Sequence, residues 1–430
     1  MDLKEKIITS YNDFEGQNVS AELQEIRRGA LEDFKKLGFP TKKMEAWKYT
    51  SLKSVLKEDY NLFPKGDANV KSEDVKKYII DNIDSHTIVF VDGKFNADLS
   101  NLTDEKFVCT LSSALNNSEH KNVIEKHFNK IAKQDNLTSL NTAFASEGAF
   151  VHVPKSVTIE KPIQIVYFST GNTIVQPRNL VVVEQNAHVK IIERHQNLSE
   201  NSVLTNSVTE IFCDRDATVD YYKIQNDNLQ ASLVDNTFAE QKSNSECSVH
   251  TFSFGGNITR NNLNFYQKGE HMNSILKGVT ILAEKQHVDH YTLVHHIEPN
   301  CESHQDYKGI YDDKSVGVFN GKVYVEKEAQ KTDAYQQNDN ILLTDSATIN
   351  AKPQLEIFAD DVKCSHGCTI GQLDDSALFY MQQRGIPKKQ ANGLLMFAFA
   401  NTVLESVKIP ELQKRITNFI AQKLEVDIEF

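Results

Sequence analysis

We expect a mainly β fold in which a solenoid of stacked strands lies between two helical regions. Three textures along the 430 residues indicate this fold. Apolar residues recur at helical spacing before about residue 60 and again after about residue 373, whereas short β-branched runs broken by Asn, Asp and Gly fill the stretch between 150 and 362. We therefore divide the chain into an N-terminal helical and mixed region, a β core and a C-terminal helical region: 1–150, 151–372 and 373–430.

The N-terminal region begins with a predicted helix that Gly38 and Pro40 end. A strand is predicted further along, at Thr87–Val91, and the Asp92-Gly93 turn follows it. The helix is predicted because apolar residues recur every three or four positions, at Leu23, Ile26, Ala30, Phe34 and Leu37.

The β core resembles itself at an interval of about thirty residues. Ala187, Ala217 and Cys247 each lie two positions before a valine, which places each pair on one face of a strand. Such a period predicts stacked coils, with these three residues at equivalent coil positions. A β-sandwich is the alternative, but its hairpins would be richer in Asn-Gly and Asp-Gly turns. Because Gly and Pro are few, we expect Asn and Asp to make most turns.

Three amphipathic helices are predicted in the C-terminal region. Asp374 or Asp375 caps the first, which Gly385 ends, and Pro387 and Pro410 open the two that follow. The helices can cap the solenoid, but their apolar stripes exceed what capping needs, so we expect them to dock a partner. The docking candidates are Asp374, Asp375, Phe379, Tyr380 and Arg384.

The composition excludes several classes of protein. With 47 Lys and Arg against 59 Asp and Glu, the formal net charge is −12, so the chain lacks the basic footprint of a nucleic-acid binder and is repelled by anionic membranes. No stretch approaches the roughly 18 apolar residues of a membrane helix. The charged start predicts no signal peptide, and six scattered cysteines fit a reducing compartment, so we expect a cytoplasmic protein.

The densest polar cluster lies between residues 287 and 304, which hold five of the fourteen histidines. On a strand, His287, Asp289 and His295 share one face, while His290 and His296 share the other. Imidazole, carboxylate and thiolate together can bind iron or zinc, although the same side chains can form a ladder of hydrogen bonds between stacked strands. The candidate residues of this secondary polar cluster are His287, Asp289, His290, His295, His296, Cys301 and His304.

A second cluster, Lys363-Cys364-Ser365-His366-Gly367-Cys368, lies where the β texture ends. Spacing of two places Cys364, His366 and Cys368 on one face of an extended segment, so all three can point at one ion or cluster. The segment is not a Cys-x-x-Cys knuckle and a fourth ligand is not visible nearby, which leaves buried thiols as the alternative use. At such an edge, another chain can supply the missing ligands.

Several motifs spread over most of the chain share the pattern of one known family. They are Trp47-Lys48-Tyr49-Thr50, Asp289-His290-Tyr291-Thr292, the run from Lys352 to Gly367, Ile370-Gly371, Leu378-Phe379-Tyr380 and Arg384-Gly385-Ile386. They resemble the SufB/SufD family, whose members are scaffold subunits of the SUF system for iron–sulfur cluster assembly. The C-terminal motif is long, which argues against a chance match.

Two positions refine the resemblance. Cys364 and His366 stand where the SufB subunits have a glutamate–histidine–glutamate character, so the chain resembles the SufD subunits more closely. Cys368 departs from the family pattern, which more often has a small apolar residue there. Cys368 is therefore the weakest of the three ligand candidates.

The resemblance implies a right-handed parallel β-helix flanked by N-terminal and C-terminal helical regions. It implies a heterodimer with a SufB-like subunit through the ends of the two β-helices, and a SufC-like ATPase bound by the C-terminal helices. His366 matches a family histidine that faces the partner subunit, so His366 and Cys364 become candidates to hold a transient iron or iron–sulfur cluster shared with that partner. The chain has no P-loop, in agreement with nucleotide chemistry in the partner and no nucleotide bound here. The isolated chain can form a homodimer.

We therefore predict a non-catalytic scaffold, not an enzyme. A β-helix carbohydrate-active enzyme is the alternative, and it would require paired carboxylates in an exposed cleft and usually an export signal. A thiol redox protein using Cys364 and Cys368 is the third hypothesis. Three intervening residues and the absence of a thioredoxin-like βαβ pattern argue against it.

Overall fold

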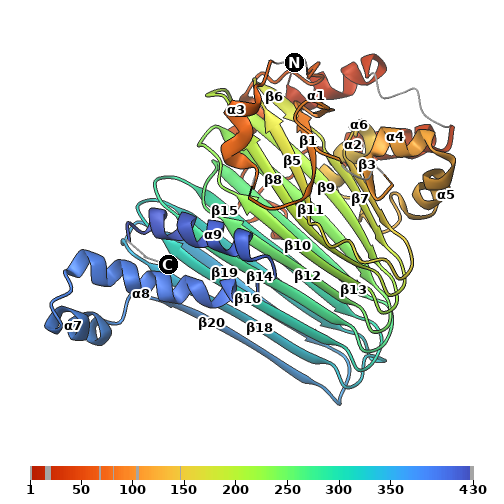
Figure 1. The fold of residues 1–430 in the computed structure, drawn as a ribbon. Helices are drawn as coiled ribbons and strands as arrows, with labels where there is room; N and C mark the ends of the chain where they lie inside the picture. Colours follow the sequence, from red (N-terminus) through yellow and green to blue (C-terminus); the bar gives the residue numbers. More distant parts are fainter. Residues whose placement is uncertain are drawn as a thin grey trace.

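The computed structural model describes residues 2–14, 21–66, 69–80, 82–102, 106–145 and 147–426. Figure 1 shows a long solenoid of strands that run side by side, with the N-terminal helices at one end and the C-terminal helices along one side. The predicted fold class, a mainly β parallel solenoid with helices at both termini, is confirmed.

The N-terminal helices close one end of the solenoid. In α2 the predicted residues Leu23, Ala30 and Phe34 are buried and Ile26 is partly buried, but Leu37 at the helix end is 45% exposed. Gly38 follows the helix with a φ of +64° that suits glycine. Phe34 packs in one core with Ile174 and Leu204 of the sheets. The helices are α1 (Leu3–Thr9), α2 (Ala21–Leu37), α3 (Ser72–Val75), α4 (Leu111–Asn116), α5 (Ser118–His127) and α6 (Asn136–Phe144), with 3-10 turns at Ser10–Asp13, Glu45–Trp47, Val55–Lys57 and Lys76–Tyr78.

In the described ranges, twenty strands form the walls of the solenoid. They are β1 (His86–Val91), β2 (Lys94–Phe95), β3 (Val108–Thr110), β4 (Ala149–Val153), β5 (Ile163–Ser169), β6 (Thr173–Val175), β7 (Arg178–Val183), β8 (His188–Asn197), β9 (Val203–Cys213), β10 (Thr218–Gln225), β11 (Ala231–Gln241), β12 (Glu246–Ser253), β13 (Ile258–Gln267), β14 (Asn273–Leu282), β15 (His287–His296), β16 (Glu302–Tyr311), β17 (Val316–Val325), β18 (Asp333–Leu342), β19 (Thr348–Ile357) and β20 (Lys363–Gly371).

The strands form two sheets. Sheet 1 has the order β2-β1-β5-β8-β10-β12-β14-β16-β18-β20, and sheet 2 has the order β19-β17-β15-β13-β11-β9-β7-β4-β3 with β6 beside β9. Neighbours are parallel except in the pairs β1–β2 and β3–β4. The chain alternates between the sheets along the core, and this parallel pairing excludes the hairpin sandwich.

Seven successive turns that lead from sheet 2 into sheet 1 each contain one residue in the left-handed region. Asn or Asp occupies four of these positions, as predicted, and Ser, His and Lys adopt the same conformation at the other three. The residues, with φ between +57° and +62°, are Ser156, Asn186, Asp216, Asn244, His271, Asn300 and Lys331.

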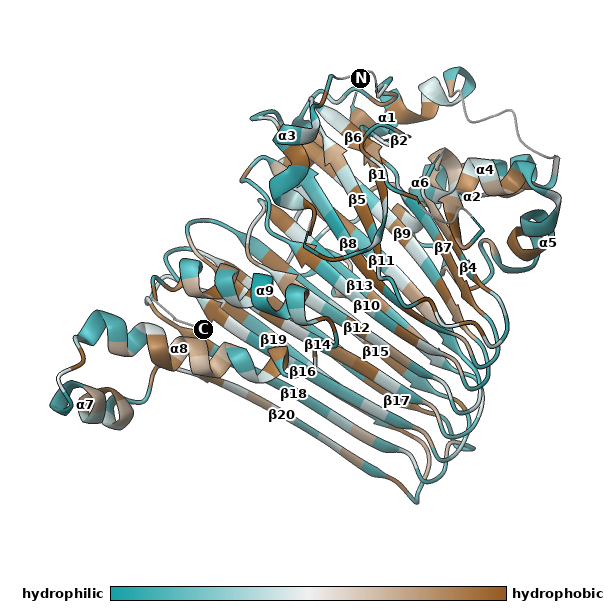
Figure 2. Cartoon of the chain, in the orientation of Figure 1, coloured by the Kyte–Doolittle hydropathy of each residue, from teal (hydrophilic) through white to brown (hydrophobic). Residues whose placement is uncertain are grey.

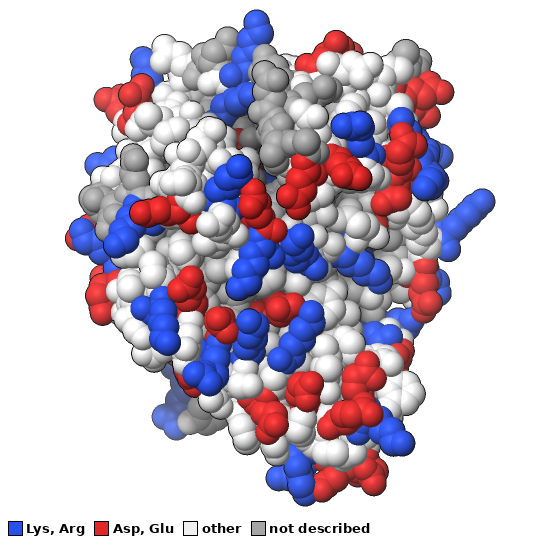
Figure 3. Space-filling view, turned by 90° about the vertical axis from the view of Figure 1, so that its right-hand side faces the viewer, with Lys and Arg blue, Asp and Glu red and all other residues white. Residues whose placement is uncertain are grey.

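Acidic and basic side chains are interspersed along these turns. Figure 3 shows Lys and Arg interleaved with Asp and Glu on this face of the molecule. The Lys242 ammonium lies 3.5 Å from the Asp214 carboxylate, and the Lys268 ammonium lies 2.7 Å from that of Glu240. Exposed pairs of this kind contribute little stability each.

The predicted thirty-residue spacing between equivalent coil positions is correct from Ala187 to Ala217 but not from Ala217 to Cys247. Thr218 pairs with His188, so Ala217 follows Ala187 in the stack as predicted. Thr218 also pairs with Glu246, which lies 28 residues on, so Cys247 lies beside Val219. The predicted equivalence of Cys247 with the two alanines is wrong, because this coil is two residues shorter. A slip of two residues keeps the same face, and Cys247 remains buried in the lumen.

Alternate residues of each strand point into the lumen, as the alternating bands of Figure 2 illustrate. The apolar lumen residues form one large cluster. A buried ion cluster interrupts it: the Lys223 ammonium lies 3.4 Å from Glu193 in sheet 1 and 2.6 Å from Asp235 in sheet 2. Although burial opposes ionisation, the Lys223 charge lowers the pKa of Glu193.

The three predicted C-terminal helices are present as α7 (Asp375–Gln383), α8 (Lys388–Leu404) and α9 (Pro410–Lys423). Helices α8 and α9 pack on the outer face of sheet 1, where Met396 and Leu412 join a core with Phe252. Helix α7 has no buried residue and projects from the solenoid (Figure 1). Within the described ranges, every helix is too short or too polar to cross a membrane.

Candidate functional site at the open end of the solenoid

The last coil of the solenoid has no layer above it. Within the part of the chain that the structure describes, β19 pairs only with β17 and β20 only with β18, so each strand leaves one backbone edge unpaired. No residue of β19 or β20 is buried, whereas every residue of β5, β7 and β9 is. We call the surface made by β19 and β20 the open end.

Cys364, His366 and Cys368 lie on the inner face of β20. Each pairs with a lumen residue of β18 that is buried, so the predicted shared face is confirmed. The pairs are Cys364 with Ala334, His366 with Gln336 and Cys368 with Asn338.

The spacing along β20 limits what these side chains can hold alone. Same-face neighbours on a strand lie about 6.6 Å apart, so Cys364 and Cys368 are separated by about 13 Å. In the described ranges, no group of three or more His, Cys, Asp or Glu side chains converges on a metal-sized site. The open end therefore offers a partial ligand set.

The thiols and the histidine of β20 differ in how readily they can bind a metal ion. Burial raises the pKa of both Cys364 and Cys368, and a thiol binds metal as the thiolate. The imidazole of His366 binds metal through a ring-nitrogen lone pair and needs no such ionisation. His366 is therefore the donor that this surface offers most directly.

Several large apolar side chains are exposed at the open end. Phe358 is 59% exposed and Ile370 is 51% exposed, and Ile357 and Tyr335 are also exposed. Ile357 and Phe358 lie where β19 ends and β20 begins, whereas Ile370 lies at the far end of β20. Exposed large apolar side chains of this kind mark places where another molecule packs. The open end thus combines two unpaired sheet edges, exposed apolar side chains and a central histidine.

The histidine cluster of β15 is divided between the two faces of the strand, as predicted. His290 and His296 point into the lumen, where the imidazole of His290 pairs with Thr280 at 2.9 Å and that of His296 with Ser303 at 2.9 Å. Burial lowers the pKa of His290 to about 4 and that of His296 to about 3. Each imidazole thus has a hydrogen-bond partner inside the buried lumen.

The outer face of β15 carries His287, Asp289 and His295. The buried Asp289 pairs with Arg260 and accepts a hydrogen bond from the hydroxyl of Thr50, which also lies 2.9 Å from His287 Nε2. Arg260 in turn stacks on the Trp47 ring at 4.1 Å. These contacts fasten the Trp47-to-Thr50 segment to sheet 2.

The remaining members of the cluster lie apart from one another. His295 Nε2 is 2.9 Å from a Glu326 carboxylate oxygen on the outer face. Cys301 is buried, with its thiol 3.2 Å from the Gly269 carbonyl, and burial raises its pKa. His304 lies on the outer face of sheet 1. The structure therefore does not bring the seven residues together.

The sequence analysis missed the glutamine that lies under His366. Gln336 is fully buried, and neither its amide nitrogen nor its amide oxygen has a hydrogen-bond partner among the described residues. The only available signal was the alternation of β18, which places a polar residue where the lumen face is expected. That signal does not reveal an unpaired group.

The docking candidates of the C-terminal region lie on or beside the projecting helix α7. Asp374 caps the helix by accepting a hydrogen bond from the Ser376 backbone at 2.9 Å. Phe379 is 63% exposed and Tyr380 is 60% exposed, with Arg384 bonded to the Tyr380 hydroxyl. This helix presents aromatic side chains without a covering layer.

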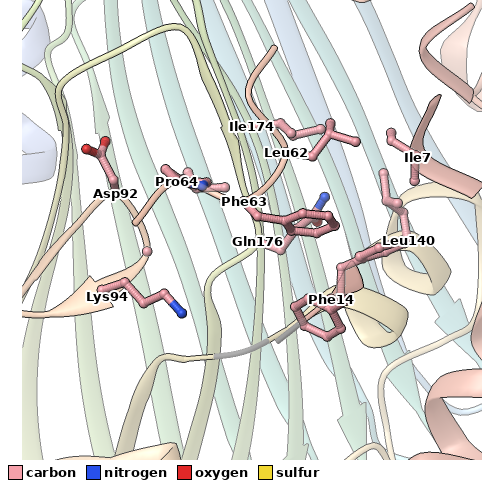
Figure 4. A pocket seen from close by; sticks show the side chains of 13 residues that line it. Ile7, Phe14, Leu62, Phe63, Pro64, Asp92, Lys94, Leu140, Ile174 and Gln176 are labelled. Atoms are coloured by element: carbon pink, nitrogen blue, oxygen red, sulfur yellow. The ribbon is translucent and has the colours of Figure 1, made fainter. Parts of the chain in front are cut away.

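A pocket at the opposite end of the molecule has a different character (Figure 4). Its one carboxylate, Asp92, accepts hydrogen bonds from the backbone and the hydroxyl of Thr170 at 2.8 and 2.6 Å. The pocket is a packing gap of the N-terminal helices rather than a reactive site. Most of its lining is apolar: Ile7, Phe14, Leu62, Phe63, Leu140, Phe144 and Ile174.

The fold defines a β-solenoid protein with one uncovered end. Comparison with known proteins places it among proteins of iron–sulfur cluster assembly. The family model described as SUF system FeS cluster assembly, SufBD core domain, matches residues 166–399, and the SufBD protein N-terminal region matches residues 2–165. The chain belongs to the SufBD family, and the resemblance seen in the sequence is confirmed.

Several curated relatives cover nearly the whole chain. An iron–sulfur cluster assembly SufBD family protein of Synechocystis is 31% identical over 410 residues, covering 92% of this chain and 90% of its own. The iron–sulfur cluster assembly protein SufD of Escherichia coli is 27% identical, with 92% and 91% covered. SufD of Bacillus subtilis is 27% identical, with 94% of each chain covered.

Proposed function

We propose that this chain is a non-catalytic scaffold subunit of the SUF system that works in the cytoplasm. It pairs through its open end with a SufB-like subunit and binds a SufC-like ATPase through its C-terminal helices. The observation that carries the proposal is the open end itself: two unpaired sheet edges, with His366 in the middle of β20 and exposed apolar side chains near both ends of that strand. The isolated chain would use the same edges to form a homodimer.

In this proposal, iron or a nascent iron–sulfur cluster is the cargo and not a resident cofactor. His366 offers one donor at the middle of β20, and the partner supplies the ligands that the open end lacks. A site shared between two chains suits a scaffold, because separation of the chains weakens the hold on the cluster and lets it leave. The chain itself binds no nucleotide, and the ATPase partner drives that change.

The test of the shared site compares three substitutions in the assembled complex. We expect His366→Ala to leave folding and subunit association nearly intact while it lowers cluster formation during anaerobic reconstitution with iron and sulfide. Cys364→Ser and Cys368→Ser should have milder effects. Full cluster formation by His366→Ala would contradict the role of the histidine.

The test of pairing places a charge at the open end. Ile370→Glu should weaken binding of the SufB-like subunit by at least about 30-fold, the equivalent of losing an interface residue that contributes about 2 kcal/mol. Leu229→Glu is the matched control, since Leu229 is an exposed apolar residue in a turn between β10 and β11. Unchanged pairing of Ile370→Glu would place the interface elsewhere.

The test of ATPase docking uses α7. Phe379→Glu should abolish binding of the SufC-like subunit without changing the unfolding transition, because Phe379 makes no buried contact in this chain. Leu229→Glu again serves as the control. If every charged substitution on α7 leaves binding unchanged, the docking surface lies on another element.

A further inference from the structure

The lumen beneath the open end contains polar groups that have no hydrogen-bond partner among the residues that the structure describes. Gln305, Gln336 and His366 lie side by side on the inner face of three successive sheet 1 strands, β16, β18 and β20. Gln305 and Gln336 are both 0% exposed. Gln305 Nε2 and both polar atoms of Gln336 lack hydrogen-bond partners among the described residues.

Leaving these groups unpaired is costly. Each buried donor or acceptor without a partner costs about 1–3 kcal/mol. A leucine of similar volume at position 336 would avoid that cost, so packing alone does not explain the glutamine. Gln241, by contrast, is an equally buried glutamine deeper in the same lumen, and its amide donates to the Asn273 carbonyl at 3.0 Å and accepts from Ser274. Among the described lumen residues, Gln267 also has one unpaired amide atom, its Oε1, but Gln336 is the glutamine in which both amide atoms lack a partner.

The opposite wall leaves room for the Gln336 amide. A Cβ at Gly321 in β17 would lie 2.5 Å from Gln336 Nε2, so a side chain at position 321 would collide with the amide. In the next coil, Gly321 pairs with Pro353 of β19, whose ring has no hydrogen-bonding group. His366 is the adjacent last-coil side chain that can pair with the amide.

We infer that Gln336 is a positioning residue for His366. This inference rests on the proposed role of His366 at the shared site. Gln336 Oε1 accepts the N–H of one imidazole nitrogen when a partner closes the open end. The other ring nitrogen then presents its lone pair outward, toward the iron. Acceptors of this kind orient metal-binding histidines and fix the tautomer that binds.

The hydrogen bonds below Gln336 have the direction that this role needs. The Thr292 hydroxyl, which can donate only one hydrogen, donates to Gln305 Oε1 at 2.6 Å. A second lone pair of that oxygen is available to Gln336 Nε2. In the proposed closed state, Gln336 Nε2, which is unpaired in the structure, donates to Gln305 Oε1, and Gln336 Oε1 accepts from His366.

The experiment measures Fe²⁺ binding by anaerobic equilibrium dialysis, for the full chain alone and in complex with the SufB-like subunit. We expect Gln336→Leu to lower Fe²⁺ affinity by 10- to 100-fold, the usual effect of removing a partner that orients a metal-binding histidine. Its thermal unfolding should be unchanged or improved, because the two unpaired atoms are gone. Gln336→Glu keeps an acceptor at the same place and should restore most of the affinity.

Gln241→Leu is the matched control, and we expect it to lower stability while it leaves Fe²⁺ affinity unchanged. His366→Ala separates the inference from the proposed function. If His366→Ala binds Fe²⁺ normally, the proposed function fails and this inference with it. If His366→Ala loses affinity but Gln336→Leu does not, or if Gln336→Glu fails to restore it, only the positioning role is overturned.

Discussion

The two ends of the solenoid share the same strand geometry, but one end is covered by helices and the other is uncovered. At the capped end, the N-terminal helices cover the sheets, and Phe34 and Leu140 are fully buried against Leu204. At the open end, Phe358 and Ile370 are more than half exposed and both sheets end on an unpaired edge. The chain covers one end with its own helices, so the bare edge at the other end is not a requirement of the fold.

The two strands of the open end also differ from each other. Exposed edges are usually protected by charges or proline, and β19 carries Lys352, Pro353 and Glu356. In β20 the only charge is Lys363 at its start, and 364–371 is an uncharged edge. This asymmetry indicates that β20 is the edge left available for pairing, and it is the strand that carries His366.

The largest expected difference between the ends concerns ion pairs. The Arg178 guanidinium lies 2.6 Å from Glu210, and both side chains are 0% exposed. Glu210 also accepts hydrogen bonds from the backbone of Asn129, Ile131 and Ala132, which fastens the cap to sheet 2. Arg178→Met leaves a buried carboxylate without its counter-charge, so we expect a loss of about 3–5 kcal/mol in the free energy of unfolding, measured with urea.

The matched control for that prediction is Lys331→Met. Lys331 pairs with Asp361 in the turns of the open end, where the two side chains are 64% and 60% exposed. Solvent screens such a pair, so its loss should change the free energy of unfolding by less than about 1 kcal/mol. Equal losses for the two variants would show that the ends do not differ in burial as the structure describes.

The next comparison removes one phenyl ring from each end. Phe34 is 0% exposed in the cap, so Phe34→Ala should lower the free energy of unfolding by about 3–5 kcal/mol through lost burial and a cavity. Phe358 is 59% exposed, so Phe358→Ala should change it by less than about 0.5 kcal/mol. A large loss for Phe358→Ala in the isolated chain would mean that a homodimer covers the open end, and the loss should then depend on protein concentration.

A third prediction asks how far water reaches from the open end into the lumen. Burial lowers the pKa of His290 to about 4, below the value of about 6.5 for an unfolded chain. Between these values the unfolded chain binds the proton and the folded chain does not, so stability falls as the pH drops from 6.5 toward 4. The cost at pH 5 is about 2 kcal/mol relative to pH 8.

Urea unfolding of the parent chain and of His290→Asn at pH 8 and pH 5 measures this effect. The variant loses hydrogen bonds at both pH values, so only the difference between the two pH values is informative. We expect that difference to be about 2 kcal/mol smaller for His290→Asn. The same pH dependence in both proteins would mean that water enters the lumen from the open end and hydrates the imidazole.

Structural features that depend on local sequence patterns were predicted correctly. Helical spacing located α2 and α7–α9, and period two placed Cys364, His366 and Cys368 on one face. The position of Cys247 failed because coil length varies by two residues, and turn length is not visible in the strand pattern.

Long-range contacts could not be predicted. Asp289 bonds to Thr50 across 239 positions of sequence, and Gln336 meets Gly321 only because the two sheets face each other. Such pairs depend on the closure of the coil, which a single sequence does not encode in any local signal. For the same reason, the unpaired amide beneath His366 was found only in the structure.

The smallest expected effect on stability concerns the thiols. The rates at which they react with a disulfide reagent should differ between the open end and the rest of the solenoid. Cys368 is exposed and Cys364 is half-buried, whereas Cys213 and Cys247 are buried, and burial raises the pKa of Cys213 to about 12 and also raises the pKa of Cys247. Reaction with a disulfide reagent such as 5,5′-dithiobis(2-nitrobenzoate) requires an accessible thiolate, so Cys368 should react first, Cys364 next, and Cys213 and Cys247 only when the chain unfolds. Cys368→Ser should remove the fast phase and change the free energy of unfolding by less than about 0.5 kcal/mol. Binding of the SufB-like subunit should protect Cys368, and a fast phase that persists in the complex would mean that the partner leaves β20 uncovered.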